Sequence, residues 1–190
     1  MDSTTLYIKN MVCPRCIKVV QETIEKSGLK VGHIELGKVT LDGNIDQEAK
    51  DILSNRLKGE GFELLDDRKQ QLIEAVKNII VELVHYGDLD ELKEKFSTVI
   101  TQKLNKDYHS ISKLFSEIEG GTVEQFIIQQ KVERVKELIA YGELTLSEIS
   151  FKMGYSSVAH LSAQFKKVTG MTPSQFKADP GSYRKPIDAI

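Results

Sequence analysis

Two cysteines separated by two residues are the side chains of this chain whose types and spacing best suit chemistry. Cys13 and Cys16 enclose Pro14 and Arg15, and the sequence contains no other cysteine. Two thiolates at this spacing can bind a soft ion such as Cu(I) or Zn(II), or form a disulfide reversibly. Because a helix is expected to begin beside the pair, its backbone N–H groups and dipole should favour the thiolate form, and Arg15 should offset the negative charge.

Three interpretations of this pair stay open from the residues alone. It is a site for Cu(I) or another soft metal ion, a thiol–disulfide switch, or a pair of structural cysteines. The histidines are too scattered to supply a third or fourth ligand, lying at His33, His85, His109 and His160. A closed four-ligand zinc site needs such ligands and is therefore disfavoured.

The elements around the pair follow from the hydrophobic pattern of the first 65 residues. Short apolar runs predict strands at residues 6–8, 31–36, 39–41 and 62–65. Helical spacing predicts helices at residues 16–24 and 46–57, with Asp46 capping the second. Gly37-Lys38 predicts the hairpin turn between the two middle strands. The order strand, helix, strand, strand, helix, strand predicts an α+β ferredoxin-like domain, with both helices on one face of an antiparallel sheet.

In this βαββαβ context the cysteine loop resembles that of a heavy-metal-associated domain. The resemblance rests on the Met-x-Cys-x-x-Cys pattern of residues 11–16 and on Gly61-Phe62 before the last strand, and it covers about residues 3–65. It implies that the two cysteines hold a soft metal ion. Two departures concern the loop itself: Asn10 stands where that family usually has glycine, and the rigid ring of Pro14 restricts how the loop opens around an ion.

The second half of the chain contains an internal repeat with an offset of 50 residues. Residues in the first copy that match the second are Ile111, Ser112, Phe115, Gly120, Thr122 and Phe126, which correspond to Leu161, Ser162, Phe165, Gly170, Thr172 and Phe176. The repeat predicts one supersecondary unit used twice in an all-α domain. Between the copies, residues 123–141 predict a single long helix, capped by Thr122 with Gln125 and ended by Gly142.

Each copy reads as a helix, a tight turn and a second helix. In the second copy Gly154 ends one helix and Ser157 begins the next, while in the first copy Asn105 and Asp107 take these places. This is the helix-turn-helix arrangement, which lays its second helix in the major groove of double-stranded DNA.

The end of the second copy contains the most specific motifs of the sequence. They recur in order as Gly154-Tyr155, Phe165-Lys166-Lys167, and the run Gly170, Thr172, Pro173, Ser174 and Phe176. Over about residues 68–185 the chain resembles the AraC/XylS family of bacterial transcription regulators. The resemblance implies two helix-turn-helix units joined by a long helix and bound to double-stranded DNA, with RNA polymerase as a further candidate partner.

The resemblance places the recognition helices at about residues 108–117 and 158–167. On the first, the outward polar side chains that can donate to guanine or phosphate are His109, Ser112, Lys113 and Ser116. The outer face of the second is small, with Ala159, Ser162 and Ala163, so we expect the first unit to supply most direct readout of bases. The second unit is expected mainly to hold the DNA backbone through Ser156, Ser157, His160, Gln164, Lys166 and Lys167, and Ser162 is a further candidate for DNA contact. Lys131 stands where the family usually has arginine. Because a lysine cannot form the forked pair of hydrogen bonds of an arginine, we expect any contact that it makes there to be held less tightly.

Composition and motif content exclude several function classes. The 190 residues are 40% hydrophobic and 28% charged, with a formal net charge of −2. No apolar run long enough to span a membrane and no secretion signal stands in the sequence, so a cytoplasmic protein without a membrane partner is expected. Phosphate-binding loops and hydrolase motifs are missing, and we expect no enzyme activity.

These observations predict four segments. They are a heavy-metal-associated-like domain at residues 1–66, a connecting helix at 67–90, an AraC-type DNA-binding domain at 91–185, and a tail at 186–190. The expected function is sequence-specific transcriptional regulation that responds to a soft metal ion or to thiol redox state. The alternatives are a metal-trafficking or metal-buffering protein and a thiol-redox protein, both using the cysteine pair.

Overall fold

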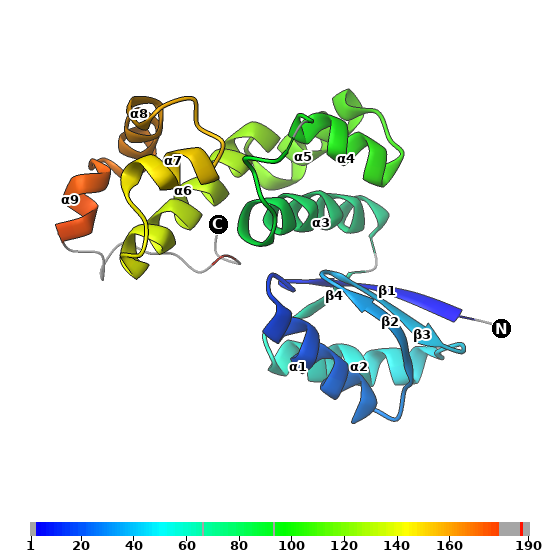
Figure 1. The fold of residues 1–190 in the computed structure, drawn as a ribbon. Helices are drawn as coiled ribbons and strands as arrows, with labels where there is room; N and C mark the ends of the chain where they lie inside the picture. Colours follow the sequence, from blue (N-terminus) through cyan, green and yellow to red (C-terminus); the bar gives the residue numbers. More distant parts are fainter. Residues whose placement is uncertain (1–2, 66, 93, 179–186, 188–190) are drawn as a thin grey trace. The chain divides into compact units, whose positions relative to one another are not determined.

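The computed structural model describes residues 3–65, 67–92, 94–178 and 187, and the chain divides into two compact units, Met1–Asn78 and Ile79–Ile190 (Figure 1). Apart from Ile187, the tail expected at residues 186–190 lies outside the described residues. None of the described helices is both long and apolar enough to cross a membrane.

The first unit contains a four-stranded antiparallel sheet and two helices. Its elements are β1 (Ser3–Lys9), α1 (Pro14–Glu25), β2 (Val31–Glu35), β3 (Lys38–Asp42), α2 (Gln47–Gly59) and β4 (Glu63–Leu65). The strands lie in the order β2-β3-β1-β4, and each neighbouring pair is antiparallel. The sequence of strands and helices agrees with the prediction. The hairpin turn falls one residue earlier than expected, at Leu36-Gly37, because Lys38 already pairs with Glu35 in the ladder.

Alternation along the strands gives the sheet one apolar face. Leu6 and Ile8 of β1 are buried with Val39 and Leu41 of β3, and the same core contains apolar side chains of both helices, namely Val20, Ile24, Leu53 and Leu57. Figure 1 shows α1 and α2 on one side of the sheet. A strand that buries every second residue positions its other residues on the opposite face, so the apolar pattern alone decides which face meets the helices.

The helix α3 (Arg68–Val81) follows β4 and contacts the sheet through polar groups. Gln71 Nε2 donates to the carbonyl oxygen of Leu65 at 2.8 Å. At the hairpin turn, Gly37 has a φ of +76°, and a Cβ there would lie 1.9 Å from Nδ2 of Asn78. Both the left-handed backbone and this close approach therefore require glycine at the turn.

The second unit is all-helical among its described residues. After α3 come the π-helical segment η1 (Glu82–Tyr86), α4 (Phe96–Leu104), α5 (Tyr108–Glu119), α6 (Val123–Tyr141), α7 (Leu146–Lys152), α8 (Val158–Thr169) and α9 (Pro173–Ala178). The sequence predicts a connecting helix over residues 67–90, whereas Glu82–Tyr86 within it have π geometry. The division between the two units falls inside α3, between Asn78 and Ile79.

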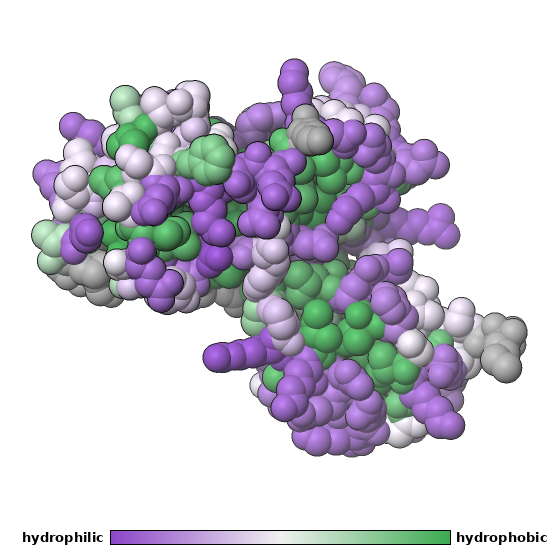
Figure 2. Space-filling model, in the orientation of Figure 1, coloured by the Kyte–Doolittle hydropathy of each residue, from purple (hydrophilic) through white to green (hydrophobic). Residues whose placement is uncertain are grey.

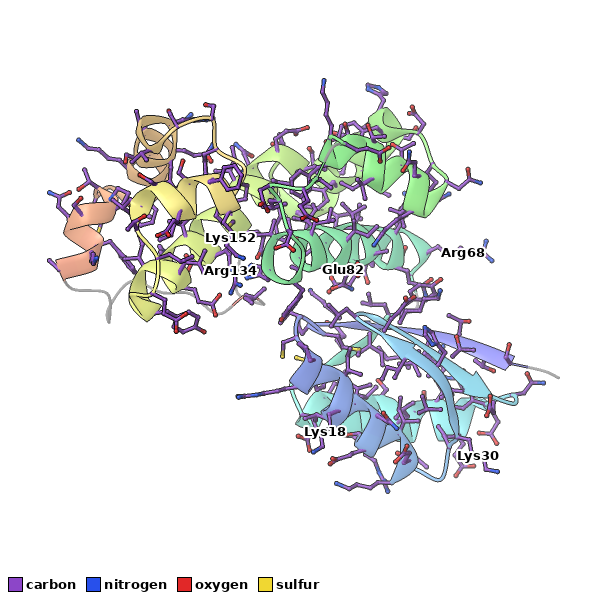
Figure 3. The ribbon with its side chains drawn as sticks, viewed as in Figure 1. Lys18, Lys30, Arg68, Glu82, Arg134 and Lys152 are labelled. Atoms are coloured by element: carbon purple, nitrogen blue, oxygen red, sulfur yellow. The ribbon has the colours of Figure 1, made fainter. Side chains whose placement is uncertain are left out.

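Side chains around η1 connect it to two of the later helices. Lys103 of α4 donates to Glu82 at 2.8 Å, and Lys152 of α7 pairs with Asp88 at 3.8 Å. Figure 3 labels one member of each pair, Glu82 and Lys152. These pairs are partly exposed and contribute little to stability. On the face drawn in Figure 2, hydrophilic residues cover most of the surface of both units. The stability of the second unit therefore depends mainly on its buried apolar residues, several of which recur in both copies of the internal repeat.

Candidate nucleic-acid interface and cysteine pair

The internal repeat of the sequence is also a repeat of structure. The helices α5 and α8 both contain 12 residues, and each begins and ends 50 residues from its counterpart. Each ends at a glycine in the left-handed conformation, Gly120 with a φ of 71° and Gly170 with a φ of 81°. Every position on α5 therefore has a defined structural equivalent on α8.

The next helix begins in the same way in both copies. The hydroxyl of Thr122 accepts from the backbone of Gln125 at 3.1 Å, and the side chain of Gln125 accepts from the backbone N–H of Thr122 at 2.9 Å. Thr172 and Gln175 repeat the arrangement at 3.3 and 2.8 Å. The first of these capping boxes confirms the start predicted for α6, because capping chemistry is local in sequence.

A pair of phenylalanines packs the core of each copy. The ring centroids of Phe115 and Phe126 lie 5.8 Å apart, and those of Phe165 and Phe176 lie 5.7 Å apart. Between the copies, Val168 of α8 lines a hollow of about 500 Å³ together with Phe115 and Phe126. The two copies thus have matching cores and lie beside each other on α6.

The turns between the paired helices differ in length. Three residues connect α4 to α5, with Asn105 in the left-handed region at a φ of 49°. Five connect α7 to α8, and here Gly154 takes the left-handed conformation at 63°. A Cβ at Gly154 would lie 3.2 Å from the carbonyl oxygen of Leu89, a tight contact, so both the space and the left-handed backbone favour glycine here.

The structure places the residues predicted for DNA contact on the outer face of α5. His109 and Lys113 are exposed, while Ser112 and Ser116 are half-buried. The opposite face carries Ile111 and Phe115, at 0% and 1% exposure, so the polar set faces away from the core.

On α8 the predicted set divides into free and internally bonded side chains. Lys166 and Lys167 are exposed in the last turn, and Ser162 is half-buried on the outer face. The remaining predicted residues have partners within the turn: Ser157 accepts from the backbone of His160, Ser156 bonds His160 Nδ1 at 3.1 Å, and Gln164 accepts from the hydroxyl of Tyr155 at 2.8 Å. These contacts fix the start of α8 from within.

Tyr155 is the centre of this cluster, and no local sequence pattern predicts its contacts. Its ring lies edge-on to His160, with centroids 5.3 Å apart, and the Nζ of Lys131 lies 4.2 Å from its centroid. Burial lowers the pKa of Lys131 to about 8. The lysine expected to form a loose clamp is thus held by an aromatic face, through a contact between residues 24 positions apart that no local pattern encodes.

The N-caps of the two equivalent helices differ in charge. Asp107 begins α5 and accepts from the backbone N–H of Ser110 at 2.9 Å, whereas the neutral Ser157 begins α8. Hydrogen bonds from Ser110 hold the pKa of Asp107 below its ordinary value, with a smaller contribution from nearby His109. The N-terminus of α5 therefore carries a fixed negative charge that α8 lacks.

The cysteines lie at the start of α1. Cys13 is the N-cap residue, and its Sγ lies 3.0 Å from the Sγ of Cys16; both are free and half-buried. Burial and the hydrogen bond with Cys13 raise the pKa of Cys16, although backbone hydrogen bonds from the loop act in the opposite direction. The expected stabilisation of a thiolate is therefore wrong for Cys16, because its burial outweighs the helix start.

The two sulfurs suit a soft ion with few ligands. Within the part of the chain that the structure describes, no group of three or more His, Cys, Asp or Glu residues is arranged to hold a metal. The loop is anchored next to the pair: Asn10, at a φ of 71°, donates from Nδ2 to the carbonyl of Gly61 at 3.0 Å, and its backbone N–H donates to Glu74 of α3 at 3.3 Å. Asn10 thus takes the left-handed conformation that glycine usually takes.

Comparison with known proteins places one domain in the second unit. Residues 100–179 match the family model of the helix-turn-helix domain. The HTH-type transcriptional regulator YtdP of Bacillus subtilis is 20% identical over 177 residues, which are 93% of this chain and 23% of that protein. The Msm operon regulatory protein of Streptococcus mutans is 26% identical over 107 residues, 55% of this chain and 37% of that protein.

Among solved structures, the C-terminal domain of the two-component response regulator yesN from Fusobacterium nucleatum is 28% identical with a TM-score of 0.47. The match covers 55% of this chain and 95% of that one. The chain spans about a quarter and just over a third of the length of the two curated relatives. The family match is therefore confined to residues 100–179, within the second unit.

Proposed function

We propose that this chain is a sequence-specific, DNA-binding transcriptional regulator of the AraC type, since its second unit contains a helix-turn-helix domain over residues 100–179. The observation that carries the proposal is the repetition of α5 and α8 with the same length, the same ends and the same core. Two equivalent helices joined by one continuous helix, α6, are suited to lie in two neighbouring segments of the major groove.

The two helix-turn-helix units divide the work in this proposal. On α5 the exposed His109 and Lys113 donate to base edges, with Ser112 and Ser116 as further donors. On α8 the exposed Lys166 and Lys167 neutralise phosphates, while the cluster around Tyr155 holds the helix start in place. The partner is double-stranded DNA, which puts the protein in the cytoplasm, and RNA polymerase is a further proposed partner.

Substitution of one lysine on each helix tests this division. Lys113→Ala should lower the preference for a selected site over random duplex by about tenfold, the weight of one good base contact. Lys167→Ala should weaken binding to all duplexes alike and lower the slope of log affinity against log salt by about one. Fluorescence anisotropy across a salt series measures both. Equal losses on selected and random duplex for both variants would contradict the division.

The first unit, over about residues 3–65, is proposed to be a ferredoxin-like, heavy-metal-associated-like domain. Its strand order β2-β3-β1-β4 and its two helices support this, as does the position of the cysteine pair at the start of α1, directly after β1. Cys13 and Cys16 would hold Cu(I) or another soft ion, which would supply a charge and a cross-link between the two sulfurs. The same two sulfurs, 3.0 Å apart, also support reversible disulfide formation.

Two measurements separate the alternatives. Anaerobic titration with Cu(I), with Cys13→Ser/Cys16→Ser as the control, should give one ion per chain that the variant does not bind; full stoichiometry in the variant would exclude the site. Binding to random duplex across a salt series separates a regulator from a metal carrier or a thiol-redox protein, since only the regulator should show a steep dependence on salt.

A further inference from the structure

The equivalence of α5 and α8 allows their outer faces to be compared position by position. Ten of the twelve counterpart pairs have the same exposure in both helices, among them 109 with 159, 112 with 162, 113 with 163, and 117 with 167. Positions at these places on a recognition helix meet the same part of a half-site. Any difference in side-chain chemistry between counterparts is then a difference between the two half-sites.

The counterparts nearest the start of each helix differ in the base atoms that they can contact. His109 and Lys113 are exposed donors one turn apart on α5. In the major groove, guanine presents two acceptors, N7 and O6, that such donors read. At the same places α8 has Ala159 and Ala163, both exposed. A methyl group cannot donate, but it packs against the C5 methyl group of thymine, which no other base carries in DNA.

The counterparts in the last turn differ in charge. Lys166 and Lys167 of α8 stand where α5 has Ser116 and Glu117, and these two lysines and Glu117 are exposed. The acidic N-cap Asp107 of α5 corresponds to the neutral Ser157 of α8. Phosphate contact is therefore favoured on α8 and opposed on α5 at both ends of the helix.

We infer that the two helices bind half-sites of different composition: α5 takes one that presents guanine to His109 and Lys113, and α8 takes one that presents thymine methyl groups to Ala159 and Ala163. This inference rests on the proposed function. It goes beyond it by assigning the base that each half-site offers at equivalent positions.

Base analogues test the inference on a duplex selected from a random-sequence pool. Replacing thymine by uracil removes only the C5 methyl group and keeps base pairing. One such replacement in the α8 half-site should lower affinity about fourfold, the effect of exposing one buried methyl group. Replacing guanine by 7-deazaguanine in the α5 half-site removes the N7 acceptor and should lower affinity about tenfold. The same replacements outside the half-sites are the control.

Exchange of counterpart residues assigns each effect to its helix. Ala163→Lys should remove the sensitivity to uracil at the base that residue 163 faces, leave it at the base that Ala159 faces, and shift the selected base at the first position from thymine to guanine. Lys113→Ala should remove the sensitivity to 7-deazaguanine at the guanine that Lys113 faces in the other half-site. Both changes keep good helix formers at exposed positions, so far-ultraviolet circular dichroism should be unchanged.

The outcomes distinguish the inference from the proposed function. A chain that binds no selected duplex more tightly than random DNA would refute the proposed function. A chain that binds a selected duplex but tolerates uracil at every thymine, or that loses affinity with 7-deazaguanine in both half-sites alike, would refute only the inference. Retention of the thymine preference by Ala163→Lys would also overturn it.

Discussion

Lys131 is a charged residue in unusual surroundings for its type. It lies on α6, half-buried, with its Nζ 4.2 Å from the centroid of the Tyr155 ring. Tyr155 in turn donates its hydroxyl proton to Gln164 on α8. One lysine therefore connects the long helix α6 to the turn before α8, by a cation–π contact in place of the forked hydrogen bonds of an arginine.

The lowered pKa of Lys131 predicts a rise in stability at alkaline pH. In the folded chain the ammonium group loses its proton near pH 8, compared with 10.5 for an ordinary lysine. Between these values the unfolded chain binds the extra proton, so raising the pH favours the folded state. From pH 8 to about 9.5, below the titration of ordinary tyrosines, the unfolding free energy of the wild type should rise relative to that of Lys131→Met. Urea denaturation at several pH values measures this difference; parallel curves would contradict it.

Local contacts at this scale could be predicted from the sequence and distant ones could not. The capping pair Thr122 and Gln125 is three residues apart, and its geometry follows from the helix start itself. Lys131 and Tyr155 meet only because the chain returns along α6 after a turn, which no short pattern records. The pKa of Cys16 was expected to fall for a local reason, the helix start, and rises because of burial, which depends on the whole fold.

At the scale of elements, the two N-caps are a natural exchange experiment. Asp107 and Ser157 occupy the same position of α5 and α8 and accept from the backbone in the same way. Aspartate and serine cap helices about equally well, so exchanging them should leave stability nearly unchanged. They differ in charge, however, and the carboxylate of Asp107 would repel a phosphate near the helix start, whereas the neutral Ser157 would not.

Asp107→Ser should therefore raise affinity for every duplex severalfold without changing sequence preference. The slope of log affinity against log salt should become steeper by up to about one, the value for one phosphate contact. Ser157→Asp should do the reverse. Binding to selected and random duplexes at two salt concentrations, with thermal unfolding as the control for folding, tests both. If either variant altered the preference for one sequence over another, the N-caps would have a role in base readout, contrary to expectation.

The packing of η1 against α6 includes a buried polar pair. His85 Nε2 lies 2.9 Å from Gln130 Oε1, and the two residues are 6% and 0% exposed. Among the described residues, His85 Nδ1 and Gln130 Nε2 have no further partner. Burial lowers the pKa of His85, so the imidazole is neutral in the folded chain. The pair is costly to break but not fully satisfied.

Replacing both members of this pair should lower the unfolding free energy by less than the sum of the two single replacements. His85→Leu should cost about 1–3 kcal/mol because it strands the buried amide of Gln130, and His85→Leu/Gln130→Leu should cost less than the sum of the single changes. The unfolding free energy of the wild type should also fall as the pH drops below about 6.5. In this range His85 binds a proton in the unfolded chain more readily than in the folded chain, where it is buried. Additive costs, or equal pH dependence in the wild type and the double variant, would exclude this account.

Element types in the second unit could be predicted because helical spacing and glycine stops are strong signals. The ends of α6 at Thr122 and Gly142 agree with the prediction. The π geometry of η1 could not be predicted, since residues 72–86 keep an ordinary apolar helical pattern up to Tyr86. The extra residue of a π turn is accommodated by tertiary packing, and here the segment packs against α6.

For the whole molecule, the helix α3 belongs in part to each of the two units. Its first part contacts the loop of the cysteine pair, where Asn10 donates to Glu74, and the division between the units falls four residues later. The sequence predicted a boundary near residue 66, because a charged break is visible there. The first part of α3 is instead grouped with the first unit, because contacts formed in the folded chain, such as that of Asn10 with Glu74, join it to that unit.

Any response of DNA binding to the cysteine pair must obey reciprocity. If Cu(I) at Cys13 and Cys16 changes the affinity for a selected duplex by some factor, that duplex must change the affinity for Cu(I) by the same factor. For a regulator we expect a factor of at least five, the lower end of ordinary coupling. Anaerobic titration of the full chain measures Cu(I) affinity with and without duplex, and anisotropy measures duplex affinity with and without Cu(I). In Cys13→Ser/Cys16→Ser, duplex affinity should not respond to Cu(I). Equal affinities in all four measurements would mean that the first unit binds its ligand without regulating the second.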